Sequence, residues 1–335
     1  MTVLVTGGSG LVGSHVIAAL RARSIPVRAL SRARGGSAVR ELGAEVVEGD
    51  VTDPAAWSRA AQGVRAIVHA AALVTQRRSF EDFVDVNVGG TRLAVATARA
   101  GGLRLVYLSS VAVYGRAARS RPGSVGIAEE FPFEPLPDAD FYARSKRLAE
   151  QVVHEGAEHG GFTAVSLRPN VIYGEGDRLF TPRVIRVLRW GFVPLVGGGA
   201  NHLACVYAGN VATAALAALE APSNGFKAYN VTHDAPPPLT QREFFDAFGV
   251  ELGVRLRHAP VPEALARMGV GLWTGAQRLL DRDGYAGVGR SAVSFLTRDN
   301  PYVASSAARE LGWRPPFDTH AAIRRSVRWY RDHGS

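Results

Sequence analysis

The chain has 335 residues, of which 47% are hydrophobic and 21% charged, a composition typical of a globular protein with one large domain or two closely joined ones. Its net charge is +9, but the arginines are scattered and form no dense basic run with interleaved aromatic residues, which argues against a nucleic-acid partner. No apolar stretch is long enough to span a membrane, the first ten residues show no signal-peptide pattern, and the single cysteine, Cys205, excludes an internal disulfide, so we expect a cytoplasmic protein.

Hydrophobic periodicity predicts alternating strands and helices along the first half of the chain. Short buried strands are predicted at 2–7, 26–32, 44–50, 65–72, 104–110 and 163–169. Helices with apolar residues at helical spacing are predicted between them, at 10–24, 36–43, 55–63, 80–101 and 141–160. Because strands alternate with helices, we expect an α/β fold of the Rossmann type, with a doubly wound parallel sheet.

The alternation breaks at two places, which indicate the domain organisation. Residues 116–138 are rich in Pro, Gly and Ser and predict a long functional loop. After residue 174 the pattern becomes irregular, although residues 205–220 predict one more strand and helix that return to the sheet. We expect a nucleotide-binding domain and a smaller substrate-binding domain. Their ranges are 1–174, completed by about 204–232, and 175–203 with 233–335, respectively.

The segment TGGSGLVG places three glycines, Gly7, Gly10 and Gly13, between the first predicted strand and the first predicted helix. Glycines here let a pyrophosphate approach the backbone, and the free N–H groups of a helix N-terminus, at Leu11 and Val12, favour an anion. The alternative is a tight turn whose glycines serve packing alone. Because the strand and the helix are both predicted in the required places, we favour a dinucleotide site.

The end of the second predicted strand indicates which dinucleotide is bound. NAD-binding folds place an acidic residue there to accept hydrogen bonds from the ribose hydroxyls, whereas this chain has Ser31 followed by Arg32. An arginine can pair with a 2′-phosphate that a carboxylate would repel, so NADP(H) is favoured over NAD(H). Asp50 and Val51, after the third strand, are placed to meet the adenine. The alternative for Asp50 is that it caps the following helix.

Tyr142 and Lys146 stand four residues apart in a predicted helix and so share one face of it. The chain has only two lysines, Lys146 and Lys227, among its 39 basic residues, which sets this position apart from an ordinary solvated helix. A nearby ammonium lowers the pKa of a tyrosine, so the pair can move a proton between an alcohol and a carbonyl. Ser109 and Ser110 end the fifth strand, where ligands bind in open α/β sheets. We assign the substrate-orienting role to Ser110, with turn chemistry or a cofactor contact as the alternative for either serine.

Seven motifs together resemble the extended short-chain dehydrogenase/reductase family. They are the three glycines, GD at 49–50, HAAA at 69–72, Asn87, LSSVAVYG at 108–115, Tyr142-x-x-x-Lys146 and LRPNVIYG at 167–174. The resemblance covers nearly the whole chain and implies catalysis by Ser110, Tyr142 and Lys146. It implies cofactor contacts by Tyr142, Lys146, His69, Ala70, Ala71, Asn87, Ser109, Pro169, Val171 and Ile172. It implies a small-molecule substrate and no metal, and it allows a homodimer joined through the helix that carries Tyr142.

Residues outside the catalytic set indicate the branch of the family. Sugar-nucleotide 4,6-dehydratases carry an Asp–Glu pair where this chain has Val111 and Ala112, and the 4-epimerases usually carry the acidic residue that Ser31 replaces. Segments 181–218 and 295–317 are similar to the 3β-hydroxysteroid dehydrogenase and sterol or β-keto-acid reductase branch. The resemblance therefore implies an NAD(P)-dependent dehydrogenase or reductase that interconverts a secondary alcohol and a ketone on a lipophilic substrate, which is steroid-like, β-keto or polyketide-like.

Residues 261–280 carry apolar side chains at helical spacing, among them Leu265, Met268, Leu272 and Trp273. Three interpretations stay open for this segment: a lid over a lipophilic substrate, a weak lipid-surface contact, or an ordinary core-facing helix. Two further functions also stay open for the chain. One is a sugar-nucleotide epimerase that retains NAD, and the other is a non-catalytic nucleotide-binding protein on the same fold.

Overall fold

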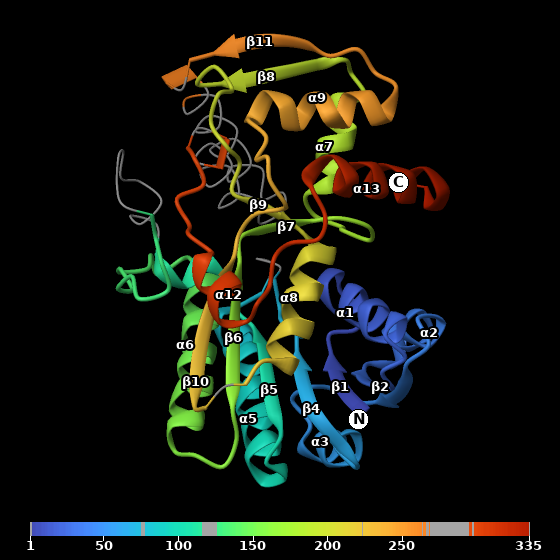
Figure 1. Cartoon of the computed structure of the whole chain (residues 1–335), viewed down its shortest axis with the longest axis vertical. Coiled ribbons are helices and arrows are strands. Elements are labelled where there is room, and N and C mark those ends of the chain that lie inside the picture. The colour runs from blue at the N-terminus through green and yellow to red at the C-terminus, as the bar shows by residue number, and fades with distance from the viewer. Residues whose placement is uncertain are drawn as a thin grey trace.

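A seven-stranded parallel sheet occupies the centre of the molecule (Figure 1). The computed structural model describes residues 2–74, 78–115, 126–222, 224–262, 264–265, 268, 295–296 and 298–334. From one edge to the other, the strands are β3 (Glu45–Glu48), β2 (Val27–Ser31), β1 (Thr2–Thr6), β4 (Val64–His69), β5 (Arg104–Leu108), β6 (Ala164–Pro169) and β10 (Phe226–Val231). All neighbouring pairs are parallel. This order is the Rossmann order with one added strand, and it confirms the predicted doubly wound sheet.

Both faces of the sheet are buried, because side chains along each strand alternate between two hydrophobic cores. In β1, for example, Val3 and Val5 belong to one core and Leu4 belongs to the other. The first face is covered by α1 (Leu11–Ala22), α2 (Ala33–Glu41), α8 (Ala208–Glu220) and α12 (Ser305–Glu310). The second face is covered by α3 (Pro54–Ala60), α5 (Gly90–Gly101) and α6 (Phe141–Glu158).

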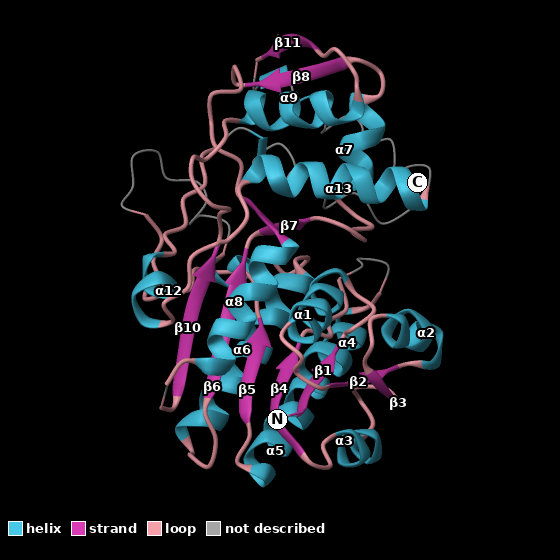
Figure 2. Ribbon diagram, turned by 45° about the vertical axis from the view of Figure 1, so that its right-hand side comes forward, coloured by secondary structure: helices cyan, strands magenta, loops and turns pink. Residues whose placement is uncertain are grey.

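A smaller unit lies above the carboxyl ends of the sheet strands (Figure 2). It contains α7 (Thr181–Leu188), β8 (Phe192–Val196), α9 (Gln241–Leu252), β11 (Arg257–Val261) and α13 (Thr319–His333). β8 and β11 pair as a parallel two-stranded ribbon. Apolar side chains of α7, α9 and α13 form a third hydrophobic core. The carboxyl edge of the sheet, where ligands bind in such folds, therefore faces this smaller unit.

The buried carboxylate of Asp234 joins the two units. Its Oδ1 accepts hydrogen bonds from the Tyr207 backbone N–H and the Asn210 side chain, both at 2.8 Å. Its Oδ2 accepts from the hydroxyls of Tyr173 at 2.5 Å and Thr319 at 3.3 Å. Because these donors come from segments far apart in the sequence, one side chain holds the start of α8 and the start of α13 together.

Two predictions differ from the structure. The strand predicted near residue 205 is β9 (Cys205–Tyr207), which pairs with β7 (Val171–Tyr173) in a separate two-stranded sheet, while β10 is the strand that joins the central sheet. The predicted single helix over 80–101 is divided into α4 (Phe80–Phe83), a π-helical turn at Val84–Gly89 and α5. In both cases contacts with distant residues, which local periodicity does not contain, decide the outcome.

Parts of two predicted segments fall outside the described residues. Residues 126–138, the described part of the predicted loop, contain no helix and only one isolated strand-like bridge, at Ile127. In the predicted helix 261–280, Leu265 and Met268 are exposed, whereas Leu272 and Trp273 lie outside the described residues. Within the described ranges, none of the helices combines the length and the apolar character that crossing a membrane requires.

Candidate active site

The glycine loop between β1 and α1 is shaped by backbone contacts that leave no room for side chains. Gly7 has a left-handed backbone with φ of 71°, and a Cβ atom there would lie 2.6 Å from the backbone nitrogen of Ala71. A Cβ at Gly13 would lie 2.1 Å from the Gly7 carbonyl oxygen. The loop is thus pressed between the end of β4 and the first turn of α1, as the spacing of the glycines predicts.

The first turn of α1 presents backbone N–H groups without a competing cap. Gly10 occupies the N-cap position, so no side chain accepts from these groups, and the turn contains no acidic residue. Leu11 and Val12 are the first two helical residues, and an α-helix cannot satisfy their N–H groups internally. The helix dipole adds positive potential at the same point. These features fit the diphosphate of a dinucleotide, as the sequence predicts.

The carboxyl end of β2 carries a small polar group and a cation. The Ser31 side chain is buried and donates to the Arg32 carbonyl oxygen at 3.2 Å. The Gly35 backbone lies against Ser9 of the glycine loop, because a Cβ at Gly35 would be only 2.7 Å from Ser9 Oγ. Arg32 is exposed at the N-cap of α2 and forms no ion pair with any described residue. The structure thus places Ser31 and Arg32 together at the carboxyl end of β2, as the sequence predicts, and no acidic side chain replaces them there.

Local hydrogen bonds fix Asp50 and Val51, which follow β3. Asp50 Oδ1 accepts from the N–H and the hydroxyl of Thr52, at 3.0 and 2.9 Å. The following helix α3 is capped by Asp53 instead, whose Oδ1 accepts from the Ala55 N–H at 2.9 Å. The capping alternative for Asp50 is therefore wrong. The Val51 carbonyl accepts from the Trp57 indole at 2.8 Å, which fixes the backbone beside the expected adenine position.

His69 ends β4, but its ring lies in the core. Its Nδ1 is 2.7 Å from Thr6 Oγ1, and the imidazole packs between the rings of Trp57 and Tyr107. Burial, assisted by the charge of Lys146, lowers the pKa of His69 to about 3, so the imidazole is neutral at physiological pH. The side chain therefore supports the strand end.

The next two residues, Ala70 and Ala71, are fixed to the end of β1. Thr6 accepts from both backbone N–H groups: its carbonyl from Ala70 at 3.3 Å and its hydroxyl from Ala71 at 3.2 Å. Ala71 is also the neighbour that excludes a side chain at Gly7. This pair of small residues therefore lies directly beside the glycine loop, where the resemblance places the cofactor.

Asn87, in the π-helical turn, connects the segment after β4 to the helix that carries Tyr142. Its side chain accepts from the Leu73 N–H at 2.6 Å and donates to the Leu73 carbonyl at 3.1 Å. It also donates to Ser145 Oγ at 2.9 Å, and the Ser145 hydroxyl donates to the Tyr142 carbonyl at 2.9 Å. Asn87 therefore fixes the position of the first turn of α6 relative to the carboxyl end of β4.

Ser110 and Tyr142 meet at the carboxyl edge of β5. Ser110 ends the strand and begins the short 3₁₀ helix Val111–Tyr114, and its Oγ accepts from the Ala112 N–H at 3.2 Å. The same hydroxyl lies close enough to the Tyr142 phenol to lower its pKa. Asp140 caps α6 by accepting from the Ala143 N–H at 3.3 Å, which starts the helix just before the tyrosine. The predicted pair is thus assembled from two elements that are distant in the sequence.

Burial governs the charge of Tyr142 and Lys146. The pKa of Tyr142 is raised from 10 chiefly by burial, while the Ser110 hydroxyl acts in the opposite direction. The pKa of Lys146 is lowered from 10.5 to about 7, again by burial, with Glu150 opposing the change. The expectation that the lysine lowers the tyrosine pKa is therefore wrong for this geometry. Besides burial, the groups that shift the Tyr142 pKa are Ser110 and Asp140, and Lys146 is not among them.

The surroundings of Lys146 were not predicted from the sequence. Its Nζ donates to the Leu108 carbonyl and lies 4.3 Å from the centre of the Tyr107 ring. One turn further along α6, Glu150 is buried and accepts from Arg168 Nε through both carboxylate oxygens, at 3.0 and 3.2 Å. The i+4 spacing of Glu150 from Lys146 is the signal that could have identified this partner. Arg168 holds the carboxylate and ties α6 to β6.

The carboxyl ends of β5 and β6 and the start of β7 add polar and apolar groups to the site. Ser109 Oγ is buried and has no hydrogen-bond partner among the described residues. Pro169 ends β6, and the Asn170 side chain that follows donates to the Thr232 carbonyl at 2.8 Å. Val171 is 38% exposed and Ile172 is partly buried. These predicted contact residues therefore lie at the edge that carries Ser110.

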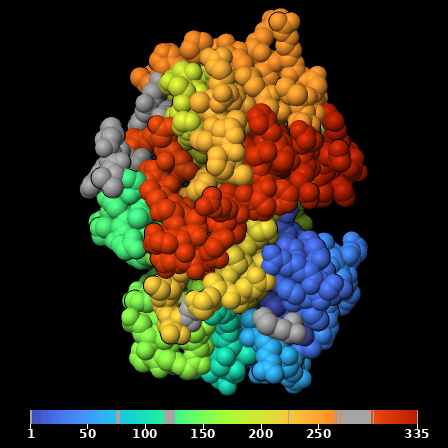
Figure 3. Space-filling model, in the orientation of Figure 1, coloured from blue at the N-terminus to red at the C-terminus, as the bar shows by residue number. Residues whose placement is uncertain are grey.

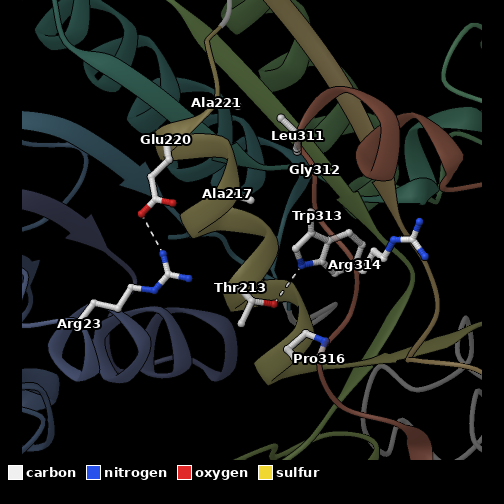
Figure 4. Close-up of a pocket in the computed structure, with 10 residues that line it drawn as sticks. All are labelled: Arg23, Thr213, Ala217, Glu220, Ala221, Leu311, Gly312, Trp313, Arg314 and Pro316. Carbon is white, nitrogen blue, oxygen red and sulfur yellow. Dashed lines mark hydrogen bonds and ion pairs between the residues drawn. The ribbon is translucent and has the colours of Figure 1, made fainter.

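A separate cavity of about 550 Å³ lies against α8 and α1 (Figure 4). An Arg23–Glu220 ion pair of 2.8 Å lies across it, and the Trp313 indole donates to Thr213 Oγ1 at 3.0 Å on its wall. Arg104, at the amino end of β5, donates to the carbonyl of Ala218 beside it. Because these groups lie at the amino ends of the strands and on the opposite face from α6, this cavity is not the candidate active site.

Comparison with known proteins places this geometry in a family. Residues 3–232 match the family described as "NAD dependent epimerase/dehydratase family". The chain is 32% identical to a 2-alkyl-3-oxoalkanoate reductase of Stenotrophomonas maltophilia over 97% of this chain and 98% of the relative. It is 33% identical to a 4-hydroxy-2-methyl-3-oxo-4-farnesyl-3,4-dihydroquinoline-1-oxide ketoreductase of Stigmatella aurantiaca, over 93% and 92%.

The fold is also shared with a solved structure of an enzyme that acts on a sugar nucleotide. The chain superposes on the UDP-glucose 4-epimerase of Thermus thermophilus, a complex with NAD, with a TM-score of 0.71. The identity is 26%, and the match covers 99% of this chain and 100% of the epimerase. The motifs, the sheet and these likenesses agree: the chain belongs to the NAD dependent epimerase/dehydratase family and is an oxidoreductase with an NAD(P)-binding Rossmann domain.

Proposed function

We propose that the protein is an NADP(H)-dependent ketoreductase or dehydrogenase that interconverts a secondary alcohol and a ketone on a lipophilic small molecule. The observation that carries the proposal is that the Ser110 hydroxyl, at the end of β5, and the Tyr142 phenol, in the first turn of α6, lie close together at the carboxyl edge of the sheet. Lys146 lies one helical turn beyond, and the glycine loop belongs to the same edge. This combination suits proton transfer to a carbonyl oxygen beside a bound dinucleotide.

The residues that would hold the dinucleotide lie along one edge of the sheet. The glycine loop, with Gly7, Gly10, Leu11, Val12 and Gly13, would bind its diphosphate. Ser31 and Arg32 would bind a 2′-phosphate, which favours NADP(H) over NAD(H). The remaining contacts would come from Asp50, Val51, Ala70, Ala71, Asn87, Ser109, Tyr142, Lys146, Pro169, Val171 and Ile172, but not from His69, which is fully buried in the core. When bound, the nicotinamide supplies or accepts the hydride at the substrate carbon.

The protein's own part in the reaction is to place and move a proton. Because its pKa is raised, Tyr142 is protonated at neutral pH and can donate to the oxygen of a ketone as that oxygen gains negative charge. Ser110 would orient the same oxygen by a second hydrogen bond. Lys146, with a pKa of about 7, exists in both protonation states near neutrality and can return a proton toward the tyrosine. In the oxidative direction the tyrosine would accept the alcohol proton.

A lipophilic substrate is supported by the relatives and by the smaller unit. The two bacterial reductases are named for an alkyl-substituted oxo acid and for a farnesylated ring. After β7 the chain reaches Phe180, whose ring packs near those of Phe244 and Phe295, with centroids 6.4 and 5.6 Å away. Phe244 is buried in the core of the smaller unit, whereas Phe180 and Phe295 are only partly buried and would gain free energy by covering apolar substrate surface. Segments 175–203 and 233–335 would form this substrate-binding half.

The test is NADPH consumption by the purified protein against a panel of 2-alkyl-3-oxo acids, steroid ketones and aromatic ketones, repeated with NADH. We expect ketone-dependent oxidation of NADPH, with NADH clearly less effective. An NAD-retaining sugar-nucleotide epimerase, which the structural likeness to UDP-glucose 4-epimerase keeps as the second candidate, would instead carry NAD through purification and convert UDP-glucose without added cofactor. That result would contradict the proposal, and so would the absence of turnover expected for a non-catalytic nucleotide-binding protein.

A further inference from the structure

The segment between α7 and β8 exposes large apolar side chains at the end of the smaller unit. Trp190 is 84% exposed, and Val187 and Phe192 are 46% and 48% exposed. In Figures 1 and 3, β8 and β11 form the end of the molecule farthest from the Rossmann domain. We call this surface, with the arginines described below, the α7–β8 tip. An exposed tryptophan beside other apolar groups is costly in water and marks an interaction surface.

Arginines flank these apolar side chains along the helix. Ile185 and Leu188 face the core of the smaller unit, while the solvent face of α7 and the turn after it are built from exposed residues. These exposed residues are Arg183, Arg186, Val187, Arg189 and Trp190. Because the residues at 183, 186, 187 and 190 follow helical spacing, cationic and apolar groups share one stripe.

The neighbouring strand extends the cationic surface. Arg257 of β11 stands beside Phe192 of β8 in the parallel register, and both are exposed. Arg255 precedes this strand and is exposed as well. Residues 178–204 and 252–262 together contain six arginines and no aspartate or glutamate. Arginine is therefore the predominant charged residue of the tip.

The acidic side chains of α9, which packs under the ribbon, are already engaged. Asp246 lies 2.8 Å from His258, and Glu251 lies 3.2 Å from Arg324 of α13. Glu243 accepts from Thr240 at the helix N-terminus. Arg186, Arg255 and Arg257, by contrast, form no ion pair with any acidic residue in the described part of the chain. An anionic partner is thus the natural complement of the tip.

We propose that the α7–β8 tip binds the surface of a bilayer that contains anionic lipid. Tryptophan and phenylalanine rings insert at the level of the headgroups, where one end of the side chain is apolar and the other is hydrated. Arginines around them pair with anionic headgroups while their methylene groups lie on the apolar layer. The proposal does not rest on the proposed reaction, since it concerns a surface at the far end of the smaller unit from the central sheet.

The test is sedimentation of the full chain with vesicles of phosphatidylcholine alone or with added phosphatidylglycerol. We expect binding only to the anionic vesicles, weakened by salt. Arg186→Glu combined with Arg257→Glu should lower the partition coefficient at least ~10-fold, and Trp190→Ala should lower it roughly 10-fold. The matched control is Arg65→Glu with Arg314→Glu, two exposed arginines outside the tip with the same change in net charge, which should leave binding within about 2-fold.

Circular dichroism and thermal unfolding of each variant establish that the variants fold. Equal binding of Trp190→Ala and the native chain, or an equal loss in the control pair, would overturn the proposal. The native chain could instead fail to bind anionic vesicles and elute as a dimer that Trp190→Ala converts to a monomer. That result would overturn the proposal and identify the tip as a contact between two copies of the chain. Tighter binding to single-stranded DNA than to the vesicles, lost in the same variants, would equally overturn it.

Discussion

Burial determines the protonation of Tyr142 and Lys146, which lie in the first two turns of α6. A charged ammonium and a phenolate are both costly inside a protein, so Lys146 shifts toward its neutral form and Tyr142 toward its protonated form. Each change keeps net charge out of the interior. The chemical consequence is a proton donor that is available at neutral pH, paired with an amine whose pKa of about 7 is close to the pH of the solution. A protonated tyrosine beside such an amine is what the proposed carbonyl reduction requires.

The lysine makes a prediction about stability. Its pKa is about 7 in the folded chain and near 10.5 when unfolded, so between these values the unfolded state binds more protons and stability rises with pH. Lys146→Met removes this dependence. Between pH 7 and 9, urea unfolding should show the free energy of unfolding of the native chain rising relative to that of the variant by about 1.4 kcal/mol per pH unit. A constant difference across this range would contradict the burial of the amine.

The proposed preference for NADP(H) depends on a single residue, Arg32. Arg32→Ala should weaken NADPH binding roughly 10-fold, because it removes an ion pair with the 2′-phosphate, and leave NADH binding unchanged. Arg40→Ala is the matched control, since Arg40 lies at the other end of α2 and pairs with Glu48 at 3.0 Å. Fluorescence titration with both dinucleotides measures the effect. A preference for NADH that Arg32→Ala does not alter would refute the assignment.

Whether a residue of the site could be predicted depends on how far away its partner lies in the sequence. Tyr142 and Lys146 could be predicted because their relation is local, four residues along one helix. The connections of Asn87 to Ser145 and of Arg168 to Glu150 span 58 and 18 residues, and periodicity carries no information about such pairs. The direction of the tyrosine pKa could not be predicted for the same reason. Spacing shows that a cation is near but not how deeply both groups are buried.

The first turn of α1 is the element on which nucleotide binding depends. A Cβ at Gly13 would lie 2.1 Å from the Gly7 carbonyl oxygen, so Gly13→Ala must move the helix away from the loop. We expect a loss of about 1–3 kcal/mol in the free energy of unfolding and a much weaker affinity for NADPH. Gly89→Ala is the control, because the nearest atom to its Cβ would be 3.8 Å away. Urea unfolding and dinucleotide titration should separate the two variants, and equal behaviour would contradict the packed loop.

The strands and helices that alternate regularly along the chain can be predicted from pattern, whereas isolated elements cannot. All six strands predicted before residue 170 are present in the sheet. The ribbon of β8 and β11 joins segments at 192–196 and 257–261, which lie far apart in the sequence and outside the regular alternation of strands and helices, so pattern does not identify them. The break of the helix over 80–101 escapes prediction because it occurs at a π-helical turn that contains Asn87, and the reason lies in the tertiary contacts of that side chain.

The two units of the molecule meet where the carboxyl edge of the sheet faces the smaller unit, and Asp234 holds them together. Asp234→Ala would leave four buried donors without their acceptor, among them the Tyr207 N–H and the Tyr173 hydroxyl. We expect a loss of roughly 3–5 kcal/mol in the free energy of unfolding. Asp53→Ala, which removes only the cap of α3, should cost about 1 kcal/mol. Similar losses in the two variants would contradict the role of Asp234 as the junction.

The Rossmann half is predictable as a whole because alternation of strand and helix has few topological solutions. The smaller unit is predicted only as an irregular remainder. Its core is built from α7, α9 and α13, which come from three separate stretches of chain. A substrate specificity built from such distant pieces is not encoded in any local pattern, so the reaction type is predicted more sharply than the substrate.

The decisive experiment for the proposed mechanism is turnover and NADPH binding in Tyr142→Phe, with the ketone that the panel identifies. We expect kcat to fall by roughly 10²–10⁴-fold, since the variant lacks the proton that Tyr142 donates. The dissociation constant for NADPH should change little, because the glycine loop and Arg32 are untouched. Turnover close to that of the native chain would contradict the assignment of Tyr142 as the acid and base of the reaction.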